Sequence, residues 1–506
     1  MPNRARAAGG QNDRVTSPLL DADGIARLRD ALLSAGYTTT GIADRLGPEA
    51  TAAAAQGDLR GALRATAHRD RLATLIRLYV CGETEPADAV AAALAPLPLE
   101  AALEAGLVTP SGDGLRQGVD LEAYGDWWVV ADVPASARPG APAVPLPADH
   151  VLGVGGASTM LAAATVRRPV DAALDLGTGC GVQALHLSTH AKRVTATDLS
   201  ARALRFAATT AALSGVEWEL VRGDLTAPVE GRRFDLVVSN PPFVAGPGTA
   251  THAYRDSGRA GDAVCAELVA AAPRLLTPGG TMQFLANWLH VAGQDWTERV
   301  AGWLAGTGLD AWIIQREVTD PVSYVRLWLA DAGQTADPAQ AAAWLDWFDA
   351  QRVEAVGFGL VNLRAAGRDD PVVRVEDLRQ TVEPPLGDRV AEWFDRQDWL
   401  RSTGDLLDVR YRAADGLQLR QDATLGPDGW EVRRQVLALT DGLRWREEID
   451  PVALALVAGS DGRLPLRAQL SLLAAAHGVP EEDLLAVAGP VVAHLVERGF
   501  LIPVTT

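Results

Sequence analysis

The stretch Leu174-Asp-Leu-Gly-Thr-Gly-Cys-Gly181 decides the fold of this 506-residue chain. A hydrophobic strand runs into a glycine turn, and a helix is predicted from Val182 to about Thr189. Glycines permit positive φ and a close approach of the backbone to a ligand, while the start of the following helix offers unpaired amides. The pattern therefore indicates a nucleotide-like cofactor at the turn, although a tight turn in any doubly wound fold is an alternative.

Apolar strands alternate with helix-length segments from about Val151 to Arg364. This alternation is typical of an α/β fold in which a mainly parallel sheet is covered by helices on both faces. A helical insertion is expected between the last two strands. The seven predicted strands are Ala172–Leu176, Arg193–Thr197, Trp218–Arg222, Phe234–Ser239, Thr281–Ala286, Ala311–Val318 and Ala355–Leu363.

Two carboxylates end strands of this predicted sheet, at the edge where the ligand crevice of such a fold lies. Asp198 closes the second strand, at the distance from the glycine turn where a carboxylate accepts hydrogen bonds from ribose hydroxyls. Asp224 ends the third strand, where it could accept from an exocyclic adenine amine. Either residue alone could be a solvated carboxylate, but the series favours a cofactor site.

The segment Asn240-Pro-Pro-Phe243 follows the fourth predicted strand and is more specific than the glycine turn. Two prolines remove backbone donors and leave carbonyls free to accept. The Asn240 side-chain oxygen and the Pro241 carbonyl can together hold a planar NH2 group, while the Phe243 ring could stack on the substrate. We therefore predict a site that alkylates an amide or amino nitrogen.

In order and spacing these motifs resemble the class I S-adenosylmethionine-dependent methyltransferases, over roughly Val144 to Leu363. Within them the chain is similar to the N-methylating branch, which includes small-domain ribosomal RNA guanine N2-, adenine N6- and release-factor glutamine N5-methyltransferases. The resemblance implies a seven-stranded Rossmann-like domain that binds S-adenosyl-L-methionine. It also implies that the segment Pro145–Thr159 closes over the cofactor.

The resemblance assigns roles to individual residues. The glycine turn would hold the methionine part of the cofactor, the end of the second strand its ribose, and the end of the third strand its adenine. Implied cofactor-binding residues are Asp175, Gly177, Thr178, Gly179, Gly181, Asp198, Leu199, Asp224, Leu225 and Asn240. Implied catalytic residues are Asn240, Pro241, Pro242 and Phe243.

Departures from the family patterns leave the substrate open. Phe243 replaces the Tyr usual in glutamine methyltransferases, and Val244 stands where RNA enzymes often have His. Arg255–Asp262 is only loosely similar to the glycine-rich segment of the glutamine enzymes. An exocyclic amine of an RNA base is the leading prediction for the acceptor. A protein glutamine amide is the alternative, and a non-catalytic cofactor-binding protein is the second.

The chain carries 46 basic and 64 acidic residues, a net charge of −18. This acidity argues against a generic polyanion-binding surface, but a local basic cluster can still bind nucleic acid. The region Arg401–Glu447 is neutral, with eight arginines and eight acids. Its later arginines form either a basic, aromatic RNA face or, as we favour, ion-paired strands: Arg433, Arg434, Arg444 and Arg446, with Trp445.

Flanking domains are predicted on both sides of the methyltransferase-like segment. We expect a disordered tail over 1–18, a mainly helical domain over 19–143, the methyltransferase domain over 144–370 with its insertion at about 323–352, and an α+β domain over 371–506. Thr38–Gly47 is helix-turn-helix-like, so the N-terminal domain is a winged-helix candidate, as is 450–506; an ordinary helical cap is the alternative.

Neither a signal peptide nor a membrane segment is visible in the sequence. Three widely separated cysteines, Cys81, Cys180 and Cys265, argue for a reducing compartment, so we predict a cytoplasmic protein. His186 and His190 lie one helical turn apart without a third ligand nearby, so no metal site is predicted.

Overall fold

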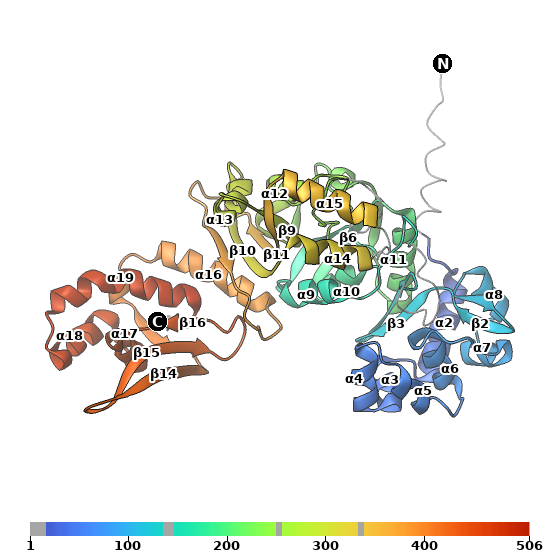
Figure 1. The fold of residues 1–506 in the computed structure, drawn as a ribbon, viewed down its shortest axis with the longest axis horizontal. Helices are drawn as coiled ribbons and strands as arrows, with labels where there is room; N and C mark the ends of the chain where they lie inside the picture. Colours follow the sequence, from blue (N-terminus) through green and yellow to red (C-terminus); the bar gives the residue numbers. More distant parts are fainter. Residues whose placement is uncertain (1–16, 135–145, 249–255, 332–337, 505–506) are drawn as a thin grey trace, which may run out of the picture. The chain divides into compact units, whose positions relative to one another are not determined.

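A computed structural model describes residues 17–134, 146–248, 256–331 and 338–504. These residues fall into two compact units (Figure 1). The first unit runs to Ala162 and resumes over Arg168–Asp377, and the second consists of Ala163–Arg167 and Leu378 onward. The tail predicted over 1–18 lies outside the described residues except for its last two.

The first unit is built on an eight-stranded sheet with the order β12-β10-β11-β9-β8-β5-β6-β7. All seven predicted strands are present. The strands of the sheet are β5 (Val170–Leu176), β6 (Ala191–Asp198), β7 (Glu219–Arg222), β8 (Phe234–Ser239), β9 (Leu276–Val291), β10 (Asp310–Thr319), β11 (Val353–Arg364) and β12 (Val373–Asp377). Only β11 runs antiparallel to its neighbours, β9 and β10.

The eighth strand, β12, extends the predicted sheet beyond seven strands. It pairs in parallel with β10 at the edge of the sheet. None of its five residues is buried, so the apolar signal that identifies an inner strand is missing here.

The strand order places β5 between β6 and β8, which are both parallel to it. The chain moves from β5 to β6 on one side and later returns to β8 on the other. A crevice forms where the direction of winding reverses, beyond the carboxyl ends of the strands. The glycine turn and Asn240 follow strands at this edge, and Asp198 is the last residue of β6.

Among the described residues, seven α-helices accompany the sheet. Their bounds are α9 (Gly156–Ala164), α10 (Val182–Leu187), α11 (Ala201–Ser214), α12 (Ala263–Leu275), α13 (Trp296–Ala301), α14 (Pro321–Asp331) and α15 (Pro338–Ala350). Helices α14 and α15 form the predicted insertion. Trp344 and Phe348 on α15 are buried in a hydrophobic cluster.

The N-terminal part of the first unit is mainly helical and shares its core with the large sheet's helix α11. It contains α2 (Ala22–Ala35), α3 (Thr39–Leu46), α4 (Pro48–Ala55), α5 (Arg60–Ala65), α6 (Arg71–Leu75), α7 (Ala87–Leu94) and α8 (Leu99–Glu104). Two hairpins follow: β1 (Val108–Ser111) with β2 (Gly114–Gln117), and β3 (Asp120–Tyr124) with β4 (Trp127–Ala131). Thr38 caps α3, since its hydroxyl accepts from the Gly41 N–H.

The second unit combines helices with two three-stranded sheets. Its elements are α16 (Gly387–Ser402), β13 (Arg410–Ala413), β14 (Leu417–Gly426), β15 (Gly429–Leu439), β16 (Arg446–Glu448), α17 (Pro451–Gly459), β17 (Asp461–Pro465), α18 (Leu466–His477), α19 (Glu481–Arg498) and β18 (Leu501–Pro503). The sheets have the orders β17-β13-β18 and β14-β15-β16. The strands β17 and β18 of the segment 450–506 both pair with β13, which lies outside that segment. The winged-helix arrangement expected within 450–506 therefore stays a prediction.

One helix of this unit differs from the sequence-based expectation. Separate helices over Glu481–Gly489 and Val491–Arg498 are expected, but α19 continues through Pro490. Proline removes one helical hydrogen bond and clashes with the preceding turn. The buried Ala488, Val492 and Leu495 lie on both sides of Pro490, so packing of one continuous face offsets that cost. Across the described ranges, no helix is both long enough and apolar enough to span a membrane.

Candidate active site

The glycine turn after β5 combines open backbone with one tightly packed position. Gly177, Gly179 and Gly181 all have positive φ, of 76°, 56° and 94°. A Cβ atom added at Gly177 or Gly179 would meet nothing within 4 Å, whereas one at Gly181 would lie 2.6 Å from the Trp218 ring. The first two glycines thus leave backbone accessible to a ligand, and the third allows close packing.

Asp175 holds this turn from below. Its side chain is fully buried, and Oδ2 accepts hydrogen bonds from the Thr178 hydroxyl (2.6 Å) and the Ala184 N–H (3.0 Å). Burial is the main reason that the pKa of Asp175 is raised to about 7. Oδ1 has no hydrogen-bond partner among the described residues. Asp175 therefore shapes the turn, and it does not line the cavity described next.

A cavity of about 430 Å³ lies beside the turn, wholly within the first unit. Its wall comes from six regions of the chain that meet at the switch point of the sheet. The lining residues fall within 148–158, 177–183, 197–203, 223–225 and 256–259, together with Asn240 and Pro242. The predicted closing segment Pro145–Thr159 contributes eight of them, although Pro145 itself lies outside the described residues.

Asp198 lies at the end of β6 and joins the turn to the next helix. Its Oδ2 accepts from the Gly179 N–H (2.9 Å), and its Oδ1 accepts from the Ser200 N–H (2.8 Å). Burial raises the pKa of this carboxyl group, and the backbone hydrogen bonds oppose the shift. Each carboxylate oxygen has further lone pairs, so Asp198 can still accept hydroxyl donors from a ligand. The neighbouring Leu199 is 56% exposed and also lines the cavity.

Asp224 and Leu225 line the same cavity beyond β7. The Asp224 side chain is 56% exposed, and its Oδ2 lies 3.4 Å from the Arg259 guanidinium. Leu225 has a φ of 43°, in the left-handed region that leucine rarely adopts. Such strained backbone is typical of ligand-binding segments.

The four residues after β8 divide between the cavity and the core. Asn240 and Pro242 line the cavity, and in the part of the chain that the structure describes the Asn240 amide makes no hydrogen bond. The Pro241 carbonyl accepts from the Phe243 N–H (2.7 Å) and keeps a second lone pair. Asn240 thus offers the cavity an unused amide oxygen and NH2 group.

The Phe243 ring lies in the core and does not line the cavity. Its side chain is 6% exposed, and its ring packs against Phe358 and Trp328, with centroid distances of 5.6 and 6.2 Å. It is not among the residues that line the cavity. Stacking of Phe243 on a planar substrate stays a prediction, and it would require the ring to leave these neighbours.

Several cavity residues carry no sequence motif that would identify them. His150 is buried at the wall and lies 3.8 Å from Asp132, and Gln183 donates to the Ser158 carbonyl (2.8 Å). Arg259 reaches the cavity and pairs with both Asp224 and Glu267. These residues come from loops and a buried helix face, where periodicity gives no functional signal.

Two weaker sequence signals resolve into ordinary packing. Trp445 is 8% exposed and lies under the Arg498 guanidinium, at 3.9 Å from the ring centroid, so it presents no open aromatic face. Arg433 and Arg434 pair with Glu431 and Glu448, which confirms ion-paired strands for those two residues. His186 faces the Tyr124 hydroxyl (2.8 Å).

Three family models match separate segments of the chain. Residues 153–295 match the methyltransferase small domain, and the matched segment contains the whole glycine turn and the Asn240 segment. Residues 34–118 and 391–503 match two domains of unknown function, DUF7059 and DUF7782. The resemblance to the class I methyltransferases is thus confirmed for the central segment.

Curated relatives match the same central segment. A release factor glutamine methyltransferase of Deinococcus radiodurans is 39% identical over 146 residues, which are 26% of this chain and 51% of the relative. A ribosomal RNA small subunit methyltransferase C of Alcanivorax borkumensis is 33% identical over 114 residues, 22% of this chain and 31% of the relative. The chain therefore spans about half or less of the length of these relatives.

Solved structures of methyltransferases also align with part of the chain. A methyltransferase from Pyrococcus furiosus is 16% identical, with a TM-score of 0.26, over 41% of this chain and 80% of its own. A methyltransferase from Thiobacillus denitrificans, solved with S-adenosyl-L-homocysteine, is 18% identical, with a TM-score of 0.24, over 41% and 89%.

Proposed function

We propose that this protein is an S-adenosylmethionine-dependent N-methyltransferase that methylates an exocyclic amino nitrogen of an RNA base. One observation carries the proposal. The free amide of Asn240 lines the same cavity as the open glycine backbone and the two aspartates, Asp198 and Asp224. Groups suited to hold a cofactor and groups suited to hold a planar amine therefore line one cavity.

The cavity residues fit the cofactor part by part. Gly177 and Gly179 have no side chain to obstruct a ligand, and Asp198 has acceptor capacity for ribose hydroxyls. Asp224 is partly exposed at the far wall, where it could accept from an adenine amine. When bound, S-adenosylmethionine supplies a methyl group on a positively charged sulfur.

Asn240 and Pro241 act on the acceptor. The Asn240 oxygen and the free lone pair of the Pro241 carbonyl accept the two N–H groups of the acceptor amine, which turns its nitrogen lone pair toward the methyl carbon. A cofactor held by the glycine turn and Asp198 would supply the methyl group to this nitrogen, and the amine would release a proton to water. Orientation and exclusion of water supply most of the rate, so a strong general base is not needed.

The names of the relatives support substrates connected with translation. Several are ribosomal RNA methyltransferases, which favours an RNA base as acceptor and a cytoplasmic site of action. The alternative is a protein glutamine amide, favoured by the glutamine methyltransferase relative at 39% identity. Both acceptors present a planar NH2 group, so the chemistry at Asn240 is the same.

The experiment that separates these substrates uses labelled cofactor. Purified protein is incubated with tritiated S-adenosylmethionine and an extract from cells that lack this protein. The product is then treated with nuclease or protease. We expect nuclease to release the label. Label that survives nuclease but not protease would assign the glutamine alternative, and no label above an Asn240→Ala control would indicate a non-catalytic binding protein.

A further inference from the structure

The second unit contains a cavity of about 310 Å³ on the β14-β15-β16 sheet, formed entirely by that unit. Three arginines, Arg420, Arg444 and Arg446, line it together with Gln418 and Thr440 and two apolar residues. None of the lining residues is acidic. In a chain with a net charge of −18, three guanidinium groups around one cavity form a distinct local environment.

Strand register brings these arginines together. Gln418 on β14 faces Ala438 on β15, and Ala438 in turn faces Arg446 on β16. Arg420 is two residues beyond Gln418, so it lies on the same face of the sheet. The central strand β15 therefore lies between Arg420 and Arg446, and the cavity spans it.

The two outer arginines differ from most others in this region because they are not neutralised. Arg433 and Arg434 have carboxylate partners, as do Arg412 and Arg467. Arg420 and Arg446 are exposed, and within residues 338–504 no ion pair or hydrogen bond occupies their side chains. Their donors are therefore available to an anionic ligand.

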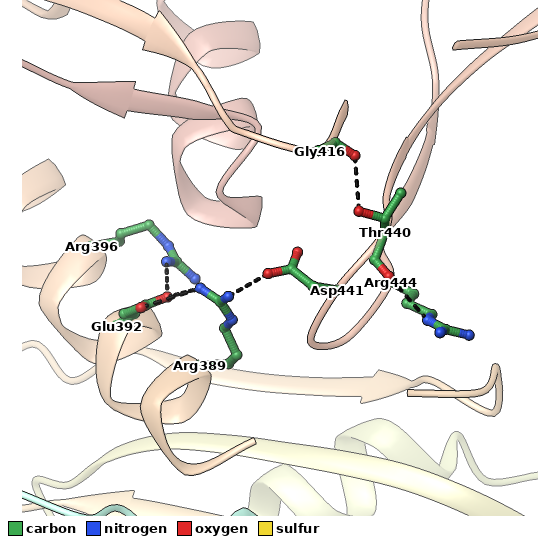
Figure 2. Close-up of polar contacts among 7 residues, drawn as sticks. All are labelled: Arg389, Glu392, Arg396, Gly416, Thr440, Asp441 and Arg444. Carbon is green, nitrogen blue, oxygen red and sulfur yellow. Dashed lines mark hydrogen bonds and ion pairs between the residues drawn. The ribbon is translucent and has the colours of Figure 1, made fainter. Parts of the chain in front are cut away.

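Arg444 lines the cavity from the loop between β15 and β16, and several contacts hold this loop in place. Its φ is 50°, a left-handed conformation that is costly for arginine. Its side chain pairs with Glu383, and its Nε donates to the Thr440 carbonyl (3.2 Å). The Thr440 hydroxyl donates to the Gly416 carbonyl (3.1 Å), which joins the loop to the start of β14 (Figure 2).

The base of the same loop is fixed to α16. Arg389 pairs with Asp441 on the loop and with Glu392 on its own helix, and Arg396 also pairs with Glu392 (Figure 2). The Gln380 side chain donates to the Leu443 carbonyl (3.1 Å). These contacts hold the loop, including the left-handed backbone at Arg444, in one conformation. The Arg444 side of the cavity is therefore preorganised before any ligand binds.

We propose that this cavity binds phosphate groups of an RNA backbone. A phosphodiester oxygen accepts well from planar guanidinium donors, and Gln418 and Thr440 add neutral donors beside them. Arg420 and Arg446 lie on opposite sides of β15, which suits a chain of phosphates better than a single one. The choice of RNA among phosphate carriers rests on the proposed function, whereas the anion site itself rests on the cavity and its arginines.

The test measures RNA binding by the full chain. A fluorescently labelled single-stranded oligoribonucleotide is titrated with wild type and with the double variant Arg420→Gln/Arg446→Gln. The control of equal net charge is Arg410→Gln/Arg463→Gln, which removes two exposed arginines of the same unit outside the cavity, one of them, Arg463, paired with Asp461. We expect the double variant to weaken binding about tenfold and to lower the salt slope by about 1.4, or about 0.7 for each phosphate that is no longer neutralised.

The outcomes decide between the site and its alternatives. Equal losses of affinity in the cavity and control variants would overturn the proposal, because total charge alone would then explain binding. Inorganic phosphate is also added as a competitor of RNA binding. The proposal would be overturned if phosphate no longer competed in the cavity variant while the RNA affinity of that variant was unchanged. Binding is read without methyl transfer, so a variant with weaker RNA affinity supports the site even if the nuclease experiment assigns another acceptor.

Discussion

The two cavities differ in what lines them. The cavity beside the glycine turn is lined by open backbone, three aspartates, one arginine and the free amide of Asn240, whereas the cavity on the β14-β15-β16 sheet has three arginines and no acid. Directional hydrogen bonds to backbone and carboxylate depend on geometry and little on salt. Attraction between guanidinium groups and phosphates adds up over charges and is screened by salt.

This difference determines how each site should respond to change. In the first cavity, loss of one hydrogen-bonding group should strongly decrease turnover or cofactor affinity, and the decrease should not depend on salt. In the second, each arginine removed should give a partial, salt-dependent decrease in affinity. Substitutions in the two cavities test this contrast, starting with the strongest effect.

The strongest effect is expected at Asn240. Asn240→Ala removes the amide oxygen that orients the acceptor, so kcat should fall about 10²- to 10³-fold, as when one preorganised hydrogen bond is removed from an active site. Cofactor affinity should change less than about twofold, because Asp198, Asp224 and the glycine turn remain. Calorimetry with the cofactor and single-turnover kinetics measure the two quantities separately. Turnover near the wild-type rate would remove Asn240 from the mechanism.

Asp198→Ala should act on cofactor binding. Loss of the acceptor for two ribose hydroxyls is expected to weaken cofactor affinity at least about 100-fold by calorimetry. Asp235 is a matched control, because its Oδ2 also accepts from two backbone N–H groups, those of Asp171 and Ala172, but it is not a cavity residue. Asp235→Ala should leave affinity unchanged. Similar decreases in both variants would show that the effect is structural.

Much of the first cavity could be predicted from the sequence because its key residues are contiguous. The glycine turn and Asn240 directly follow strands and Asp198 ends one, and parallel strands bring such positions to one edge. The expected position of the Phe243 ring differs from the structure because core packing against Phe358 is a long-range contact. Periodicity gives no information on such contacts.

The second cavity could not be predicted because it depends on register. Arg446 meets the face of Arg420 only through β15, and a bulge between Asp422 and Ala423 shifts the pairing along the hairpin. A shift of one residue would send either arginine to the opposite face. The edge strand β12 escapes prediction for a related reason, since its exposed residues lack an apolar pattern.

The glycine turn offers a comparison within one loop. In Gly179→Ala the new Cβ would occupy open space at the cavity wall, so cofactor affinity should fall about tenfold, with about 1–2 kcal/mol lost from the left-handed backbone. In Gly181→Ala the Cβ would lie 2.6 Å from Trp218, so the main decrease should be in stability. Thermal melts and calorimetry on both variants test this division. The reverse ranking would contradict the assignment of Gly179 to the cofactor.

Asp175 predicts a pH dependence of stability. Its pKa of about 7 lies above the ordinary value of 3.8, so between these values the folded state binds a proton that the unfolded state does not. Its contribution therefore favours folding below about pH 4 and is lost as the pH rises through 7. Asp175→Asn should remove this dependence and raise the melting temperature at pH 8 by about 3 °C or more. Asp171→Asn, an exposed change on the same strand, should not reproduce this effect.

The smallest effects are expected from single arginine changes in the second cavity. Arg420→Gln and Arg446→Gln should each weaken RNA binding about threefold, and their product should match the tenfold decrease of the double variant, since β15 separates the two side chains. Each effect should shrink as salt is raised, in contrast to Asp198→Ala, whose effect on cofactor affinity should persist. If one arginine carried the whole effect at every salt concentration, the site would depend on one directional contact, as in the first cavity, and the contrast between the two would fail.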